Sequence, residues 1–250
     1  MLRRIPVASF GVVALVVSAL LAGAVPWPVN DAAVESSRSD NSHDRRSTSL
    51  DTASSAIPTG SNVSVKDSAE DTVRTRTEGQ KAVASSIATS NCAGCDGQST
   101  VFQVVYFDGT GGVAADNSAA AWSSCAGCSS SAVSVQLVVA RHAQLVTVNN
   151  RALALNVSCE RCTTTAAAIQ FVISGGTRRD LSAQARKLIS QIQELLADRL
   201  ANSAQPDARR LTAPEAKKLT DETASKLEQI ILSDVGAASV QRTIDVQVGQ

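Results

Sequence analysis

The chain has 250 residues, and its 23 basic and 23 acidic side chains give a formal net charge of zero at neutral pH. Aromatic residues make up only 3% of the chain and do not gather with basic ones. This argues against a nucleic-acid partner, because such proteins carry a basic patch or stripe. Six cysteines, an even number, favour disulfide bonds in an exported protein.

The first 24 residues have the three parts of a secretory signal peptide. Arg3 and Arg4 form a cationic head, an apolar run of about 17 residues follows, and residues 22–24 provide a small-residue cleavage site. An uncleaved N-terminal anchor is the alternative, because the apolar run approaches the ~18 residues that span a bilayer. Both interpretations place the rest of the chain outside the cytoplasm. We therefore expect a secreted or cell-envelope protein that meets the membrane only if its N-terminal segment is retained.

Residues 25–79 are predicted to be a disordered tether. They are rich in Ser, Thr, Asp and Arg, and their apolar residues follow no sustained period. Such a segment cannot bury enough apolar surface to offset the entropy of ordering it. A short strand around residues 62–65 is the alternative, and His43, which lies in this segment, is expected to be solvated.

A threefold internal repeat is predicted for residues 80–176. Each copy contains a C-x-x-C pair, and the three pairs are spaced almost evenly along the chain. At the same short distance after each second cysteine, a glutamine stands within an apolar run. The repeated residues are Cys92, Cys95 and Gln103; Cys125, Cys128 and Gln136; and Cys159, Cys162 and Gln170. Asn117 and Asn150 each begin an Asn-x-Ala-x-Ala pattern before the second and third pairs, which the first copy lacks.

Each copy is predicted to fold as a strand, a cysteine turn and a second strand. After the cysteines, apolar residues such as Phe102, Val104 and Tyr106 alternate with period two, and we expect this face to form the core. The glutamine face is half-apolar. No proline occurs between Pro58 and Pro206, which suits strands that keep their backbone donors. The predicted domain is a small all-β unit of about six strands, which is either a meander or sandwich, or a short solenoid.

A helical hairpin over residues 177–235 and a C-terminal strand in residues 236–250 complete an α+β fold. Asp180 is the expected N-cap of the first helix, and Thr212 and Glu215 form a capping box for the second. We expect the helices to pack on the glutamine face of the sheet; packing against each other or a partner chain is the alternative. The expected inward residues of the first helix are Ala185, Leu188, Ile192 and Leu195, and Ile189 and Leu196 widen this stripe. Those of the second helix are Ala216, Leu219, Leu227 and Ile230, and those of the strand are Ile244, Val246 and Val248.

Three interpretations of the cysteine pairs remain open at this point. Disulfides in some connectivity suit an exported protein, and cysteines at i and i+3 of a tight turn fall within the ~4.4–6.8 Å Cα separation that a disulfide requires. The third residue of each C-A-G-C pair is a glycine, which can adopt a positive φ in such a turn. A zinc site that uses four thiolates from two of the three pairs is the alternative. A thiol-redox pair is the third interpretation, but no predicted helix N-terminus adjoins a pair to stabilise its thiolate.

No catalytic motif is visible in the chain. The two histidines are His43 and His142, and His142 is expected to be exposed where a strand meets a turn. Patterns such as H-E-x-x-H, G-x-S-x-G, the Walker motif and G-x-G-x-x-G do not occur. We therefore expect a non-catalytic interaction or structural module with no cofactor, zinc being the alternative, that acts on a protein or other partner at the envelope.

The pattern C-x-x-C-x7-Q, preceded by N-x-A-L-A-L-N-V, resembles that of a group of uncharacterised exported actinobacterial proteins. Those proteins carry tandem N-x-A-x-A-x-N-x-x-C-x-x-C segments that end in an apolar strand with glutamine, followed by a helical tail. The resemblance covers roughly residues 80–235. Related repeats occur in chains labelled as peptide zinc metalloproteases, but this chain lacks the H-E-x-x-H that such an activity requires. The resemblance therefore implies no activity.

Overall fold

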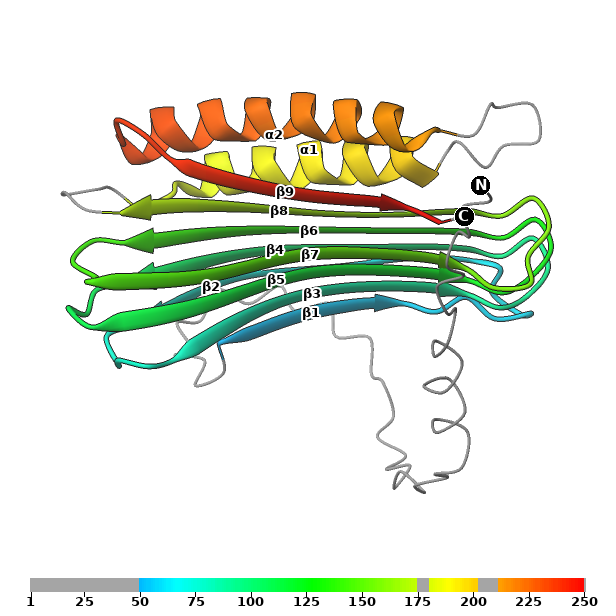
Figure 1. Ribbon diagram of the computed structural model, residues 1–250, viewed down its shortest axis with the longest axis horizontal. Coiled ribbons are helices and arrows are strands. Elements are labelled where there is room, and N and C mark those ends of the chain that lie inside the picture. Colours follow the sequence, from blue (N-terminus) through cyan, green and yellow to red (C-terminus); the bar gives the residue numbers. More distant parts are fainter. Residues whose placement is uncertain (1–49, 175–179, 202–210, 250) are drawn as a thin grey trace, which may run out of the picture. The chain divides into compact units, whose positions relative to one another are not determined.

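The computed structural model describes residues 50–174, 180–201 and 211–249, in which the repeat region forms a β-solenoid of four coils (Figure 1). The strands are β1 Asp51–Ala56, β2 Ser64–Thr75, β3 Lys81–Ser90, β4 Asp96–Phe107, β5 Gly112–Ser123, β6 Ser129–Ala140, β7 Leu145–Asn156, β8 Thr163–Ser174 and β9 Gln241–Val248. Each coil contributes one strand to each of two sheets. The odd sheet has the order β1-β3-β5-β7, and the even sheet has the order β2-β4-β6-β8-β9.

The nearly constant repeat length sets this arrangement, because equivalent residues of successive coils pair in register. Gln103 of β4 pairs with Gln136 of β6, which in turn pairs with Gln170 of β8. Strands of successive coils run parallel, whereas β9 runs antiparallel to β8. Of the two architectures that the sequence left open, the structure has the solenoid, and the predicted α+β class is confirmed.

The first coil lies within the segment that was predicted to be a disordered tether. That prediction for residues 25–79 is wrong from Asp51 onward, since β1 and β2 pair along their full lengths with β3 and β4. In a solenoid a coil gains its stability from the next coil, so a segment with little apolar surface of its own can be ordered. The solenoid therefore has four coils and eight strands, where three copies and about six strands were predicted. The predicted signal peptide, the rest of the tether and His43 lie outside the described residues.

The two faces of the even sheet differ from the prediction in what they pack against. Phe102, Val104 and Tyr106 belong to the main apolar core, as predicted, but this core lies between the even sheet and the helices. The glutamine face, expected to receive the helices, points into the solenoid, where small residues such as Ala119 and Ala121 of the odd sheet face it. The helices cover the other face because its Phe, Ile, Leu and Tyr side chains offer more apolar surface to bury.

The first helix, α1 (Ala183–Ala201), lies over β4 and β6 and buries only part of the predicted stripe, namely Ala185, Ile189 and Leu196. Leu188 and Leu195 remain 42% and 58% exposed. The buried face of α1 is rotated away from Leu188 and Leu195 because Gln193 faces the sheet. Gln193 is buried and donates its Nε2 hydrogens to backbone carbonyl oxygens of β4 and β6. Apolar periodicity could not show that a glutamine would face the sheet. The apolar residues of α1 that enter the core are Ala185, Ile189, Leu196, Ala197 and Leu200.

The second helix, α2 (Ala213–Val235), lies over β8 and β9 and begins with the predicted capping box. Asp180 does not cap α1, contrary to the prediction. Ser182 takes that role, because its Oγ accepts a hydrogen bond from the Ala185 backbone N–H at 3.1 Å. The C-terminal strand is confirmed as β9, and its residues that pack against the core are Ile244, Val246 and Val248.

Candidate functional site

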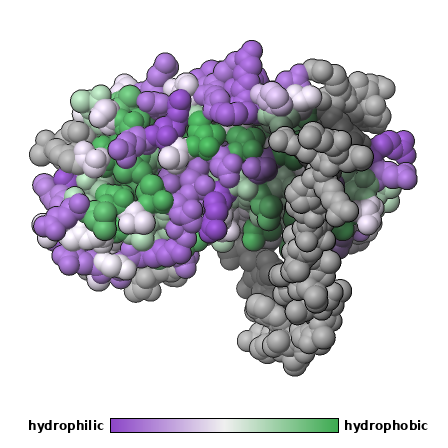
Figure 2. All heavy atoms as spheres, in the orientation of Figure 1, coloured by the Kyte–Doolittle hydropathy of each residue, from purple (hydrophilic) through white to green (hydrophobic). Residues whose placement is uncertain are grey.

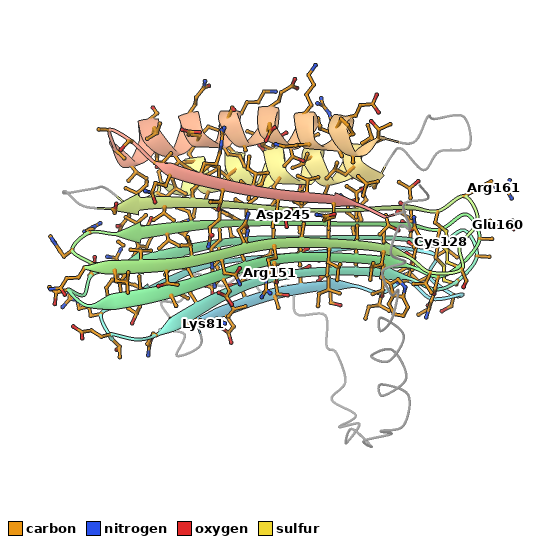
Figure 3. All side chains as sticks on the ribbon, viewed as in Figure 1. Lys81, Cys128, Arg151, Glu160, Arg161 and Asp245 are labelled. Carbon is orange, nitrogen blue, oxygen red and sulfur yellow. A yellow bond between two sulfur atoms is a disulfide. The ribbon has the colours of Figure 1, made fainter. Side chains whose placement is uncertain are left out.

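The three cysteine pairs lie in the turns that lead from odd to even strands, so they stack along one edge of the solenoid (Figure 3). In each pair the first cysteine is partly buried and the second is buried. The disulfides are Cys92–Cys95, Cys125–Cys128 and Cys159–Cys162, with Cα–Cα separations of 5.3, 5.6 and 5.9 Å. These separations lie in the ~4.4–6.8 Å range that suits a disulfide. Each pair therefore closes its own turn.

The turns stack because their backbones hydrogen-bond from one coil to the next. The N–H of Gly94 donates to the carbonyl oxygen of Ala126 at 3.1 Å, and that of Gly127 donates to the carbonyl oxygen of Glu160 at 2.9 Å. The third residue of each pair has a positive φ, which is 69° at Gly94, 67° at Gly127 and 59° at Arg161. The glycines adopt this conformation freely, as predicted, whereas the Cβ of Arg161 makes it unfavourable there.

The first coil has no cysteines and closes the equivalent turn with hydrogen bonds. Thr59 and Asn62 stand one repeat length before Cys92 and Cys95, and they exchange two backbone hydrogen bonds of 2.9 and 3.0 Å. The backbone alone can therefore form this turn, and the disulfides of the later coils lock it. The same repeat length, applied upstream of Cys92, is the signal that could have located the first coil in the sequence.

The repeated glutamines and asparagines form two ladders inside the solenoid. Gln136 Nε2 donates to Gln103 Oε1 at 2.7 Å, and Gln170 Nε2 donates to Gln136 Oε1 at 2.6 Å. In the odd sheet, Asn117 Nδ2 donates to Asn150 Oδ1 at 2.7 Å. All three glutamine side chains are fully buried, so they join neighbouring coils and cannot contact a partner.

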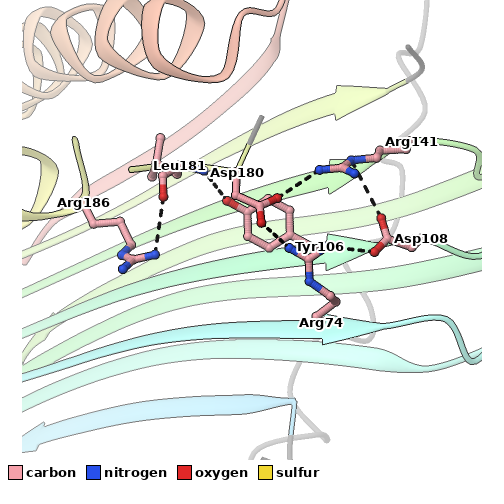
Figure 4. A network of polar contacts seen from close by, with 7 residues as sticks. All are labelled: Arg74, Tyr106, Asp108, Arg141, Asp180, Leu181 and Arg186. Atoms are coloured by element: carbon pink, nitrogen blue, oxygen red, sulfur yellow. Dashed lines mark hydrogen bonds and ion pairs between the residues drawn. The ribbon is translucent and has the colours of Figure 1, made fainter. Parts of the chain in front are cut away.

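A cluster of charged residues fastens the segment before α1 to the solenoid (Figure 4). Arg74 of β2 donates from Nη1 to Asp108 Oδ2 at 2.9 Å and from Nη2 to Asp180 Oδ2 at 2.6 Å. Arg141, which follows β6, donates from Nη2 to Asp180 Oδ1 at 2.9 Å. Asp180, which was predicted to cap the helix, thus bridges two arginines from different coils.

Tyr106 lies at the base of this cluster. The guanidinium carbon of Arg74 lies 4.7 Å from the centroid of its ring, and its hydroxyl oxygen accepts the backbone N–H of Leu181 at 2.6 Å. Burial raises the pKa of the Tyr106 hydroxyl, because the ionised form would lose its hydration. The charges of the cluster neutralise one another across β2, β4, the turn after β6 and the start of α1, and we interpret the cluster as a structural link.

The structure also locates the remaining candidate residues. His142 is exposed in the turn after β6, as expected. Among the described residues, no group of three or more His, Cys, Asp or Glu side chains is placed to hold a metal ion. In the same part of the chain, neither α1 nor α2 combines the length and apolar composition needed to span a membrane.

The outer face of the odd sheet is open to solvent and carries exposed apolar residues. Ile87 and Leu153 flank Ala120 in one register, and Trp122 pairs with Leu155 in the register two positions further on. The exposed fractions of Ile87, Trp122, Leu153 and Leu155 are 41, 47, 52 and 47%. Green apolar groups and purple polar groups share the visible face in Figure 2. Contiguous exposed apolar patches occur at interaction surfaces, so this face is a candidate for one.

Comparison of the chain with protein-family models, with curated proteins and with solved structures gave no match. Two features of the chain itself therefore bear on function. The first is the edge of stacked disulfides, and the second is the open face of the odd sheet, where Ile87, Trp122, Leu153 and Leu155 lie at the end next to those disulfides.

Proposed function

We propose that this protein is an exported, non-catalytic interaction or structural module of the cell envelope, built on a disulfide-stapled β-solenoid. The observation that carries the proposal is the stack of three disulfides along one edge. Disulfides persist in oxidising compartments outside the cytoplasm and are rare where thiols are kept reduced. The signal-peptide pattern of the first 24 residues is consistent with such a location.

Disulfides at these positions suit a module whose use is a persistent surface. Each coil of a solenoid contacts only its neighbours, so coils can open locally instead of all at once. Each disulfide closes a loop of four residues, which stabilises that turn by about 2 kcal/mol in the chain-entropy description. The disulfides therefore stabilise the turns that adjoin the exposed apolar end of the odd-sheet face.

The cysteines, the repeated glutamines and the arginines of the charged cluster have structural partners in this fold. The six cysteines are bonded in pairs, and the repeated glutamines bind one another inside the solenoid. The arginines of the charged cluster bind Asp108 and Asp180, which ties strands to the helical segment. These contacts favour a binding or structural role over a catalytic one.

The proposal is tested by the thiol content and location of the protein in its native host. Cells are treated with a thiol-alkylating reagent before lysis, and the envelope, medium and cytoplasmic fractions are examined by intact-mass measurement. We expect the protein outside the cytoplasm, with none of its cysteines alkylated. Recovery from the cytoplasmic fraction with six alkylated cysteines would overturn the proposal.

A double variant separates the proposal from the zinc alternative. Cys125→Ser combined with Cys128→Ser should leave the location unchanged and reduce stability moderately, because the first coil forms the same turn without cysteines. A zinc-binding protein should instead lose metal, which elemental analysis of the purified native chain and of the variant would show. The matched control is Ser124→Ala beside the same turn, which should change neither quantity.

A further inference from the structure

We propose that the outer face of the odd sheet is a self-association surface, on which two copies of the chain pack face to face. The two-fold axis runs parallel to the strands, between β3 and β5. This inference rests on the proposed function, since it identifies the partner of the interaction module as a second copy. Three properties of the face support it, namely its size, its pattern of large and small residues, and its charges.

The face is large enough for a specific dimer. Its four strands have up to 12 residues each. At a strand spacing of ~4.8 Å and a rise of ~3.3 Å per residue, the face covers roughly 600 Å². Two such faces bury roughly 1,200 Å² together, which exceeds the ~1,000 Å² expected of a specific interface. Sheets packed in this way lie about 10 Å apart, as in a β-sandwich.

The proposed axis keeps each residue's position along the strands and reverses the order of the strands. As a result, β1 of one copy faces β7 of the other, and β3 faces β5. Outward-facing residues that pair in register on neighbouring strands form a row across the sheet. Under this axis, each row of one copy faces the same row of the second copy in reverse order. The two rows nearest the cysteine turns are Ser55, Ile87, Ala120 and Leu153, and Thr89, Trp122 and Leu155.

Large side chains of one copy meet small ones of the other throughout the row that contains Leu153, and Trp122 meets Thr89 in the next row. The row that contains Leu153 reads small, large, small, large from β1 to β7, so its reversed copy fills each gap. Interdigitation of this kind gives an interface the packing density of a protein interior. The resulting pairs across the axis are Ile87 with Ala120, Leu153 with Ser55, and Trp122 with Thr89.

The charged residues of the face complement one another under the same axis. Asp51 of β1 and Arg151 of β7 lie at opposite edges of the face, and strand reversal brings each within two register positions of the other residue in the second copy. Lys81 of β3 and Asp116 of β5 form an ion pair of 2.5 Å within one copy. Because β3 and β5 flank the axis, the Lys81–Asp116 pair of one copy lies opposite that of the other copy. The positive and negative side chains of the two pairs therefore alternate around the axis. Figure 3 shows Lys81 and Arg151 on this face.

The ends of the solenoid are less suited to self-association. At the first coil, Asp67 Oδ2 accepts the backbone N–H of Ser55 at 2.8 Å, and at the last coil Asp245 Oδ2 accepts that of Ala152 at 2.8 Å. A carboxylate thus occupies a backbone donor of the edge strand at each end. Charged groups on edge strands oppose strand-to-strand pairing with another molecule. The open face remains as the contact.

The test is the dissociation constant of the dimer, measured by analytical ultracentrifugation of the oxidised full chain. We expect a monomer–dimer equilibrium that Leu153→Glu weakens at least ~100-fold, because a carboxylate would be buried without a partner. The matched control is Leu195→Glu, which changes an equally exposed leucine on α1 and should leave the constant unchanged. Far-ultraviolet circular dichroism of each variant checks that it is folded.

A charge exchange tests the orientation of the two copies. Arg151→Asp should weaken the dimer at least ~10-fold through repulsion from Asp51 of the second copy, and adding Asp51→Arg should restore it. A rescue of this kind is expected only if the two side chains lie close together across the axis. Failure of the double variant to recover, while the single variant is impaired, would overturn the proposed axis.

The remaining outcomes also decide the proposal. A chain that stays monomeric at about 100 µM, or a dimer that responds to Leu195→Glu and not to Leu153→Glu, overturns it. Thiol content and cellular location are measured separately from association. A monomer with three disulfides in the envelope would therefore reject self-association and retain the proposed function, whereas a reduced cytoplasmic dimer would do the reverse.

Discussion

Replacement of Gln136 by leucine should destabilise the solenoid by about 3 kcal/mol. This side chain is fully buried and joins the coils on either side of it. Its Nε2 donates to Gln103 Oε1 at 2.7 Å and to the carbonyl oxygen of Asp116 at 3.2 Å, and its Oε1 accepts from Gln170 Nε2 at 2.6 Å. Leucine has a similar volume and removes all three hydrogen bonds.

The magnitude follows from three contributions. The lost hydrogen bonds account for about 3 kcal/mol at a net ~1 kcal/mol each. Gln103 Oε1 then lacks this donor within the solenoid, which adds ~1–3 kcal/mol. The apolar surface of the buried leucine returns ~1–2 kcal/mol. The losses exceed the gain, so the variant should be destabilised.

Urea unfolding followed by far-ultraviolet circular dichroism measures this effect, and two variants provide the comparison. Gln191→Leu makes the same substitution on the exposed side of α1 and should stay within ~0.5 kcal/mol of the parent. The loss of stability in Gln170→Leu should lie between those of Gln136→Leu and Gln191→Leu. Gln170 Oε1 accepts no hydrogen bond from the described residues, so this substitution removes fewer hydrogen bonds than Gln136→Leu does. A loss below ~1 kcal/mol for Gln136→Leu would refute the view that the ladder stabilises the fold.

Three further predictions concern the turns and the charged cluster. Cys125→Ser with Cys128→Ser should lower the free energy of unfolding by about 2 kcal/mol in a urea titration and keep the fold, and complete unfolding would contradict this. Gly127→Ala should cost about 1 kcal/mol in the same assay, because φ is 67° there; no change would show that the turn relaxes. Tyr106 is the only tyrosine, so ultraviolet absorbance should show a higher pKa in the folded chain than in urea. Because the folded pKa is raised, this contribution to stability is complete below about pH 10 and is lost as the pH rises through the folded pKa. Tyr106→Phe should reduce that alkaline loss, and an unchanged pH profile would contradict the assignment.

Local signals in the sequence were sufficient for the parts of the fold whose cause is local. The cysteine turns, the alternation of the following strands and the capping box of α2 each depend on residues close together in the chain. The glycine in the third position of two cysteine pairs predicted the positive φ found at Gly94 and Gly127. The same residues could not show the chirality or stacking of the coils, which depends on pairing between residues that lie a full coil apart in the chain.

The errors arose where stability comes from a neighbouring coil or layer. The strand β2 has charged residues and few large apolar ones, and it is ordered through its pairing with β4. Alternation places Leu153 and Leu155 on one side of a strand, but it does not say whether that side meets solvent or the interior. The open face of the odd sheet could therefore not be identified from the sequence. The buried face of α1 depended in the same way on Gln193, whose partners are carbonyl groups of the sheet.

Three disulfides that each close a single turn are the feature on which the proposed module is built, and mapping of the disulfides by mass spectrometry tests their pairing. Cleavage before Asp108 separates the first pair from the second, and trypsin cleaves after Arg141 between the second and third. Trypsin also cleaves after Arg161, so a bond from Cys159 to Cys162 should hold two peptides together. We expect every pair to remain within its own turn and to be about 2 Da lighter than its reduced form. Peptides linked between different coils, or six cysteines that react with an alkylating reagent without prior reduction, would contradict the account.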